Sequence, residues 1–212
     1  MNDKAVYGVQ ETLQKDEAVI REIIDTSRGL FKKYGFKKTT MGDIALGLGR
    51  AKSSLYYYYT GKEEIFEAVV NAEMEELLAL IRESVGNART AKEKLVAYCQ
   101  CKLDKLTQLY NLSDVLKSEI AELHCMLSAI KSKFDTAQVE LVGQILTKGM
   151  ENGEFRKISP DNTRLFAYLI VSAFRGLEMP LMVSDQNCPR LDIQIGSFVD
   201  LMVEGIGISK SR

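Results

Sequence analysis

The segment that decides the fold is TMGDIALGLGRAKSSLYYYY, residues 40–59. Thr40 and Asp43 stand three residues apart and fit a capping box, so a short helix is predicted to begin directly after Thr40. Glycines should end that helix after about two turns, and a second short helix is predicted from Ala51 to about Tyr58. Two short helices joined by a tight glycine turn, with a small alanine where they cross, indicate a helix-turn-helix.

The rest of the chain also predicts helices, because apolar residues recur at spacings of three and four and no segment alternates like a strand. Before the motif, a helix is expected from about Asp16 to Tyr34, closed by Gly35. After the motif, a long amphipathic helix is expected over residues 62–84. Further helices are predicted over residues 90–110, 114–130, 132–151, 160–179 and 190–206. The sequence therefore predicts an all-α fold.

Positive charge is concentrated around the motif. The whole chain has a net charge of −1, but residues 28–62 contain eight basic side chains and one acidic side chain, a local charge of +7. DNA phosphates attract such a local patch even when the whole protein is close to neutral. The helix-turn-helix and its charge together predict binding to duplex DNA.

Composition argues against several other classes of protein. The chain has one histidine, His124, and four cysteines without a Cys-x-x-Cys pair, so we expect no metal site and reduced thiols. It lacks the Gly-x-Ser-x-Gly, P-loop and dinucleotide-binding glycine patterns, so neither an enzyme nor a bound cofactor is predicted. Neither a secretory signal nor an apolar stretch long enough to span a bilayer is present, which favours a cytoplasmic location without membrane contact.

Beyond the motif, residues 17–70 closely resemble the DNA-binding region of the tetracycline-repressor (TetR) family. Five short patterns occur in the family's order and at its spacing: Gly-Phe at 35–36, Thr-Thr at 39–40, Asp-Ile-Ala at 43–45, Leu-Tyr at 55–56 and Lys-Glu-Glu-Ile at 62–65. The resemblance implies a three-helix DNA-binding domain over residues 1–62. It also implies a larger helical domain for effector binding and dimerisation over residues 63–212, which begins with a connecting helix at 62–84.

The resemblance implies a function as well. A member of this family would be a sequence-specific transcriptional repressor that binds operator DNA as a homodimer and is released by a small-molecule effector, here unidentified. The alternative is a helical protein-interaction module with a vestigial helix-turn-helix.

The resemblance assigns DNA contacts to individual residues. Lys52 is expected to contact bases, because the first turn of a recognition helix meets base edges and lysine can donate to guanine. Arg50 and Ala51 depart from the family's usual apolar residue and capping serine, so Arg50 is expected to face a phosphate. The complete predicted set is Thr40, Arg50, Ala51, Lys52, Ser53, Ser54, Tyr56, Tyr57, Tyr58 and Lys62.

The four consecutive tyrosines have a simpler interpretation as core residues. A helix cannot turn four consecutive side chains inward, however, so at least two must face outward. Leu55 and Tyr59 are predicted to be core residues, which leaves Tyr56 and Tyr57 exposed beside the basic patch.

The larger domain carries no motif of its own. A pocket among its middle helices is predicted from residues with apolar bodies and a few polar groups, although each of them could instead be plain core. These residues are Tyr98, Leu106, Ile120, His124, Phe134 and Phe166. The helices at 160–179 and 190–206 are expected to pair with a second subunit rather than to close the monomer's own core. The predicted interface residues are Leu169, Phe174, Ile195, Phe198 and Met202.

Overall fold

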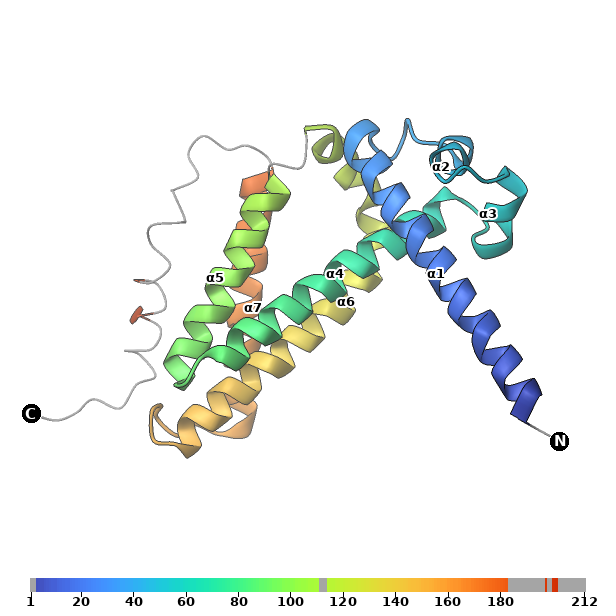
Figure 1. Ribbon diagram of the computed structural model, residues 1–212. Coiled ribbons are helices and arrows are strands. Elements are labelled where there is room, and N and C mark those ends of the chain that lie inside the picture. The colour runs from blue at the N-terminus through green and yellow to red at the C-terminus, as the bar shows by residue number, and fades with distance from the viewer. Residues whose placement is uncertain (1–2, 111–113, 183–196, 198–199, 202–212) are drawn as a thin grey trace, which may run out of the picture. The chain divides into compact units, whose positions relative to one another are not determined.

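The computed structural model describes residues 3–110 and 114–182, together with residues 197, 200 and 201. These residues form helices joined by short loops and contain no β-strand, which confirms the predicted all-α class (Figure 1). The helices are α1 (Asp3–Tyr34), α2 (Met41–Gly47), α3 (Lys52–Tyr58), α4 (Lys62–Asn87), α5 (Ala91–Tyr110), α6 (Asp114–Glu151) and α7 (Pro160–Met182). None of these helices combines the length and the apolar character that crossing a membrane requires.

Two helices differ by more than a turn from their predicted bounds. Helix α1 begins at Asp3 rather than near residue 16, and α6 is one continuous helix where two were predicted. No proline lies in either helix, and α6 has no glycine before Gly143, so nothing in the backbone requires a break near residue 131. The helix predicted over residues 190–206 lies mostly outside the described residues.

The chain divides into two compact units. The N-terminal unit comprises residues 1–73 and 114–127, and the C-terminal unit comprises residues 74–113 and 128–212. The division falls inside α4, a single helix of 26 residues that contributes side chains to both hydrophobic cores. As a division of function, the predicted boundary after residue 62 remains a prediction.

The core of the N-terminal unit fixes α2 and α3 against α1 and the start of α4. Ile44 of α2 and Leu55 of α3 are completely buried. Phe31, Phe36 and Phe66 meet in one aromatic cluster, with ring centres 4.9–5.9 Å apart. Burial of each such side chain stabilises the fold by about 1.5–3 kcal/mol, so the two short helices depend on this core rather than on their own length.

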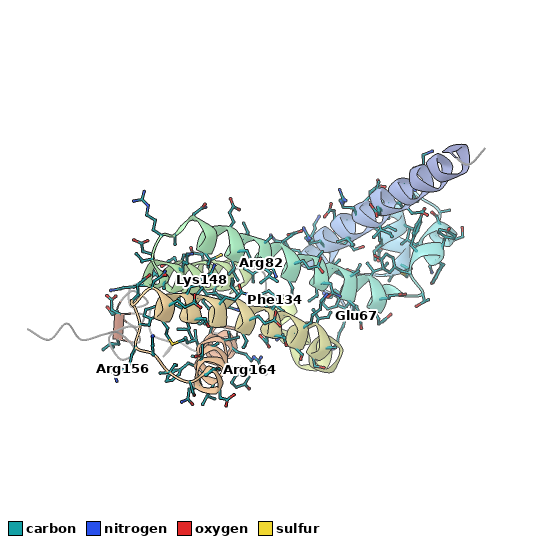
Figure 2. The ribbon with its side chains drawn as sticks, turned by 90° about the horizontal axis from the view of Figure 1, so that it is seen from below. Glu67, Arg82, Phe134, Lys148, Arg156 and Arg164 are labelled. Atoms are coloured by element: carbon teal, nitrogen blue, oxygen red, sulfur yellow. The ribbon has the colours of Figure 1, made fainter. Side chains whose placement is uncertain are left out.

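The core of the C-terminal unit is formed by α4, α5, α6 and α7. Tyr98 of α5 packs its ring edge-on against Phe174 of α7, with centres 5.9 Å apart, and Phe134 of α6 is buried in the same core (Figure 2). Cys99 is also fully buried, and burial raises the pKa of its thiol to about 12. Cys99 and Cys101 form no disulfide with each other.

A tight turn at the end of α6 closes the C-terminal unit. Gly153 adopts a φ of 74°, which favours glycine, and the backbone amides of Glu154 and Phe155 both donate to the carbonyl of Gly149. The turn thereby places the Phe155 ring directly over Gly149. The Glu154 carboxylate accepts a hydrogen bond of 2.7 Å from the amide of Ala91 and so caps the start of α5. Gly149 therefore lies at a point where three segments meet.

Candidate nucleic-acid interface

The first helix of the motif begins at the predicted capping box. The Asp43 amide donates to the Thr40 hydroxyl oxygen at 3.2 Å, and the Thr40 amide donates to the Asp43 carboxylate at 2.8 Å. The Thr40 hydroxyl also donates to this carboxylate, at 2.7 Å. Both donors of Thr40 are therefore engaged by Asp43, and a phosphate contact by Thr40 would have to displace one of them.

The capping box predicts a specific dependence of stability on pH. Hydrogen bonds from the Thr40 hydroxyl and then from its amide hold the pKa of Asp43 below its ordinary value of 3.8. A lowered pKa in the folded state stabilises the fold fully above the ordinary pKa, and this contribution is lost as pH falls through the folded-state pKa. We expect Asp43→Asn to be less stable than the wild type at pH 7 and to approach it below about pH 4 in urea titrations. A difference that stays constant with pH would contradict this assignment.

The turn presents the second helix of the motif to solvent. Gly49 has a φ of 64°, and the Arg50 amide donates to the carbonyl of Ala45 at 3.0 Å, which folds the chain back on α2. Helix α3 then begins at Lys52, and its capping position, Ala51, makes no side-chain cap, as its sequence predicts. The residues at 51–53 are all exposed, so the first turn of α3 is accessible to a ligand as large as DNA.

The tyrosines divide as predicted. Leu55 is completely buried and Tyr59 packs against the N-terminal core, whereas Tyr56 and Tyr57 are 49% and 76% exposed. The Lys52 ammonium lies 5.9 Å from the centre of the Tyr56 ring. Lys52, Tyr56 and Tyr57 therefore form an exposed surface with a cation and two aromatic hydroxyls, groups that can donate to bases and phosphates.

Two acidic residues of α1 accept hydrogen bonds from side chains of the motif. The Arg50 guanidinium donates to the Glu22 carboxylate at 2.8 Å, and the Tyr58 hydroxyl donates to the Asp16 carboxylate at 3.0 Å. Burial and the bond to Asp16 raise the pKa of Tyr58 above its ordinary value. Arg50 and Tyr58 thus have intramolecular partners, and their direct contact with DNA remains a prediction. The roles of Glu22 and Asp16 were not predicted, because nothing in the local sequence shows which residue pairs across 28 or 42 positions.

Lys62 is held inside the N-terminal unit. Its ammonium donates to the carbonyl oxygens of Phe36, Lys37 and Thr39 at 2.9, 3.2 and 3.1 Å, and lies 4.4 Å from the centre of the Phe36 ring. An ammonium has three N–H donors, and these three bonds use all of them. Lys62 therefore fastens the loop between α1 and α2, and the predicted phosphate contact would require it to give up a bond.

The geometry is that of a helix-turn-helix with an exposed second helix, and comparison with known proteins agrees. The model of the bacterial regulatory proteins of the tetR family matches residues 23–69, from α1 to the first half of α4. Over these residues the chain belongs to the tetR family. It is accordingly a DNA-binding transcriptional regulator, which confirms the prediction made from the sequence.

Relatives of this tetR-family protein match most of its length. The fatty acid metabolism regulator protein of Bacillus subtilis is 23% identical over 87% of this chain and 94% of its own length. The structure of a transcriptional regulator from Cytophaga hutchinsonii is 25% identical and superposes with a TM-score of 0.71 over 88% of this chain and 97% of that chain. FadR from Bacillus subtilis, solved with stearoyl-CoA, gives a TM-score of 0.64 at 22% identity, over 88% and 98% of the two chains.

The structure brings together only part of the predicted effector pocket of this tetR-family protein. Tyr98 and Phe134 are buried in one core, whereas Phe166 is 39% exposed on α7, because Ala167, Ile170 and their neighbours form the buried face of that helix. Phe166 therefore does not line the interior with the other two. The side chains of three further predicted pocket residues lie outside the described residues: Leu106, Ile120 and His124.

The predicted dimer-interface residues include one that is exposed and one that is buried. Leu169 is 51% exposed on α7 and is available to a partner, but Phe174 is completely enclosed within its own unit and packs against Tyr98. Phe174 is therefore a core residue, because it lies on the same face of α7 as Ile170 and Val171. The other predicted interface residues lie outside the described residues: Ile195, Phe198 and Met202.

Proposed function

We propose that this chain is a repressor that binds a two-fold operator as a homodimer and leaves it when a small molecule binds the C-terminal unit. The observation that carries the proposal is the exposed first turn of α3, where Lys52 has no carboxylate partner among the described residues. A cation in this position can donate to guanine in the major groove. Such a protein would act in the cytoplasm, where bacterial DNA lies.

Dimerisation is supported by an apolar surface on α7. Leu165, Tyr168 and Leu169 are each about half exposed, and their spacing of three and four residues places them on one side of the helix. Large apolar side chains gathered on one surface are typical of an interface with another protein. A homodimer would present two copies of α3 to successive major grooves, about 34 Å apart.

The effector is proposed to act through α4. This helix is continuous from the N-terminal core to the C-terminal core, so a ligand that alters the packing of its second half would also bias its first half. The two copies of α3 would then lose the spacing that the operator requires. The names of the matches make acyl compounds the first effectors to test, because they include a fatty acid metabolism regulator and FadR solved with stearoyl-CoA, both from Bacillus subtilis.

The proposal is tested with DNA from the region upstream of the gene. We expect retardation of a fragment from this region at low salt, and competitor DNA should abolish it only when it contains the operator. Lys52→Ala should lower the preference for the operator over random DNA by about 1–3 kcal/mol, because a base contact is lost. Lys157→Ala in the C-terminal unit removes the same charge from another exposed lysine and should leave this preference unchanged. Failure to retard any upstream fragment would refute the proposal.

A further inference from the structure

A group of polar side chains lies inside the core of the C-terminal unit, between α5 and α6. Tyr98 and Gln138 are both completely buried, and the Tyr98 hydroxyl donates to the Gln138 carbonyl oxygen at 2.8 Å. Lys102 lies one turn after Tyr98 on α5 and is only 4% exposed, and its ammonium is 5.3 Å from the centre of the Phe134 ring. Phe134, labelled in Figure 2, lies one turn before Gln138 on α6. We call Tyr98, Lys102 and Gln138 the core polar cluster.

The amide of Gln138 is incompletely satisfied. Its Nε2 atom is buried and has no hydrogen-bond partner. If the amide is turned over so that Nε2 meets the Tyr98 oxygen, the carbonyl oxygen loses its bond from Tyr98 instead. A buried unpaired polar group costs about 1–3 kcal/mol, and folded proteins keep few of them. Gln138 therefore lowers stability in the absence of a ligand.

The chemistry of the cluster indicates what would satisfy it. Gln138 Nε2 is a buried donor without a partner, so the matching group is a hydrogen-bond acceptor. The side chains packed in the same core are apolar, among them Leu95, Cys99 and Val142. A ligand that enters between α5 and α6 must therefore combine an acceptor group with an apolar body.

We propose that the core polar cluster binds the carboxylate or acyl carbonyl of an aliphatic effector. This inference rests on the proposed function, because it gives the effector site its residues and its ligand a chemical class. Gln138 donates to the acceptor oxygen, and Tyr98 orients the Gln138 amide. Binding replaces an unpaired buried amide with a hydrogen bond, so the ligand stabilises the C-terminal unit as it binds.

The first experiment compares three ligands of equal chain length without DNA: decanoate, decanoyl-CoA and decylamine. We expect decanoate or decanoyl-CoA to raise the Tm of the full-length protein and to bind in calorimetry, and the difference between them identifies the free acid or the thioester as the source of the acceptor. Decylamine is protonated at neutral pH and offers only donors, so it should bind at least about tenfold more weakly. Equal binding of decylamine, or no binding of either acyl compound, would overturn the proposal.

The second experiment removes the polar groups without a large change in volume. Replacing both partners of a buried hydrogen bond with apolar groups of similar shape is nearly neutral for folding, so the double variant Tyr98→Phe with Gln138→Leu should fold and bind DNA normally. It should bind the acyl ligand about tenfold more weakly or worse, and DNA release should require correspondingly more ligand. Gln144→Leu is the matched control, because Gln144 lies on the exposed face of the same helix, and this variant should respond as the wild type does.

The outcomes separate this inference from the proposed function. If the double variant folds and binds the acyl ligand as tightly as the wild type, the core polar cluster is not the site. If the wild type binds the acyl ligand and the double variant does not, the site is supported even when no upstream DNA is retarded. In that case the proposal that the protein binds an operator fails, while the proposed effector site stands.

Discussion

Gly149→Ala should lower the free energy of unfolding of the C-terminal unit by about 3 kcal/mol, the upper part of the usual range for overpacking a core. A Cβ atom at this position would overlap ring carbons of Phe155 and lie 2.8 Å from the Cβ of Ala91. Neither neighbour can move easily, because Phe155 is held by the turn at Gly153 and Ala91 is fixed at the capped start of α5. Thermal unfolding followed by circular dichroism should give a Tm lower by about 6–12 °C.

Gly143→Ala is the matched control for this experiment. Gly143 lies in the same helix, but a Cβ there would make an ordinary contact of 3.9 Å with the Cβ of Ala167. Alanine is a better helix former than glycine, so this variant should be as stable as the wild type or more stable by up to about 1 kcal/mol. The same loss in both variants would mean that a general effect on α6, rather than contact with Phe155, limits the position.

Lys62→Met should destabilise the N-terminal unit by about 3 kcal/mol, the value expected when hydrogen bonds from a charged donor to part-buried carbonyls are lost. Methionine keeps the apolar stem over Phe36 but cannot donate to the carbonyls of the loop between α1 and α2. DNA affinity should therefore fall for operator and random sequences alike, because the loop positions α2. Lys38→Met changes an exposed lysine of the same loop and should leave the Tm within about 1 °C.

The salt dependence of DNA binding separates this role from a phosphate contact. If Lys62 neutralises a phosphate, its removal should reduce the slope of log K against log salt concentration by about 1. If Lys62 only fastens the loop, the slope should be unchanged while the Tm falls. A reduced slope with an unchanged Tm would contradict the role of Lys62 in fastening the loop.

Local features of the motif were predictable from the sequence because their causes lie within a few residues. The capping box of Thr40 and Asp43 depends on a spacing of three. Gly35 and Gly49 both have positive φ angles and stand where the chain was predicted to turn. The exposure of Tyr56 and Tyr57 follows from helix geometry once Leu55 faces the core. Fold class, motif and the exposed first turn of α3 could therefore be inferred from the sequence alone.

Features that depend on distant partners were not predictable in the same way. The basic character of Arg50 and Lys62 suggested phosphate contacts, but a carboxylate on α1 and three carbonyls in a loop hold these side chains. Phe174 and Leu169 are both apolar residues of α7, and hydrophobicity alone does not tell which face packs inward. No pattern in the sequence indicated that Gln138 is buried, because a glutamine in an amphipathic helix is usually assigned to its exposed side.

The burial of Cys99 gives the C-terminal unit an internal reporter of its own opening. Burial raises the pKa of the Cys99 thiol to about 12, so the thiol stays protonated at neutral pH, and the side chain is shielded from reagents in any case. Modification of Cys99 therefore requires α5 to separate transiently from its neighbours, and under these conditions its rate follows the population of open molecules. Since Cys99 adjoins Tyr98 in the sequence, a compound that tightens the packing of this helix should slow the alkylation of Cys99. The rate of Cys99 alkylation can thus measure transient opening of this core without an attached dye.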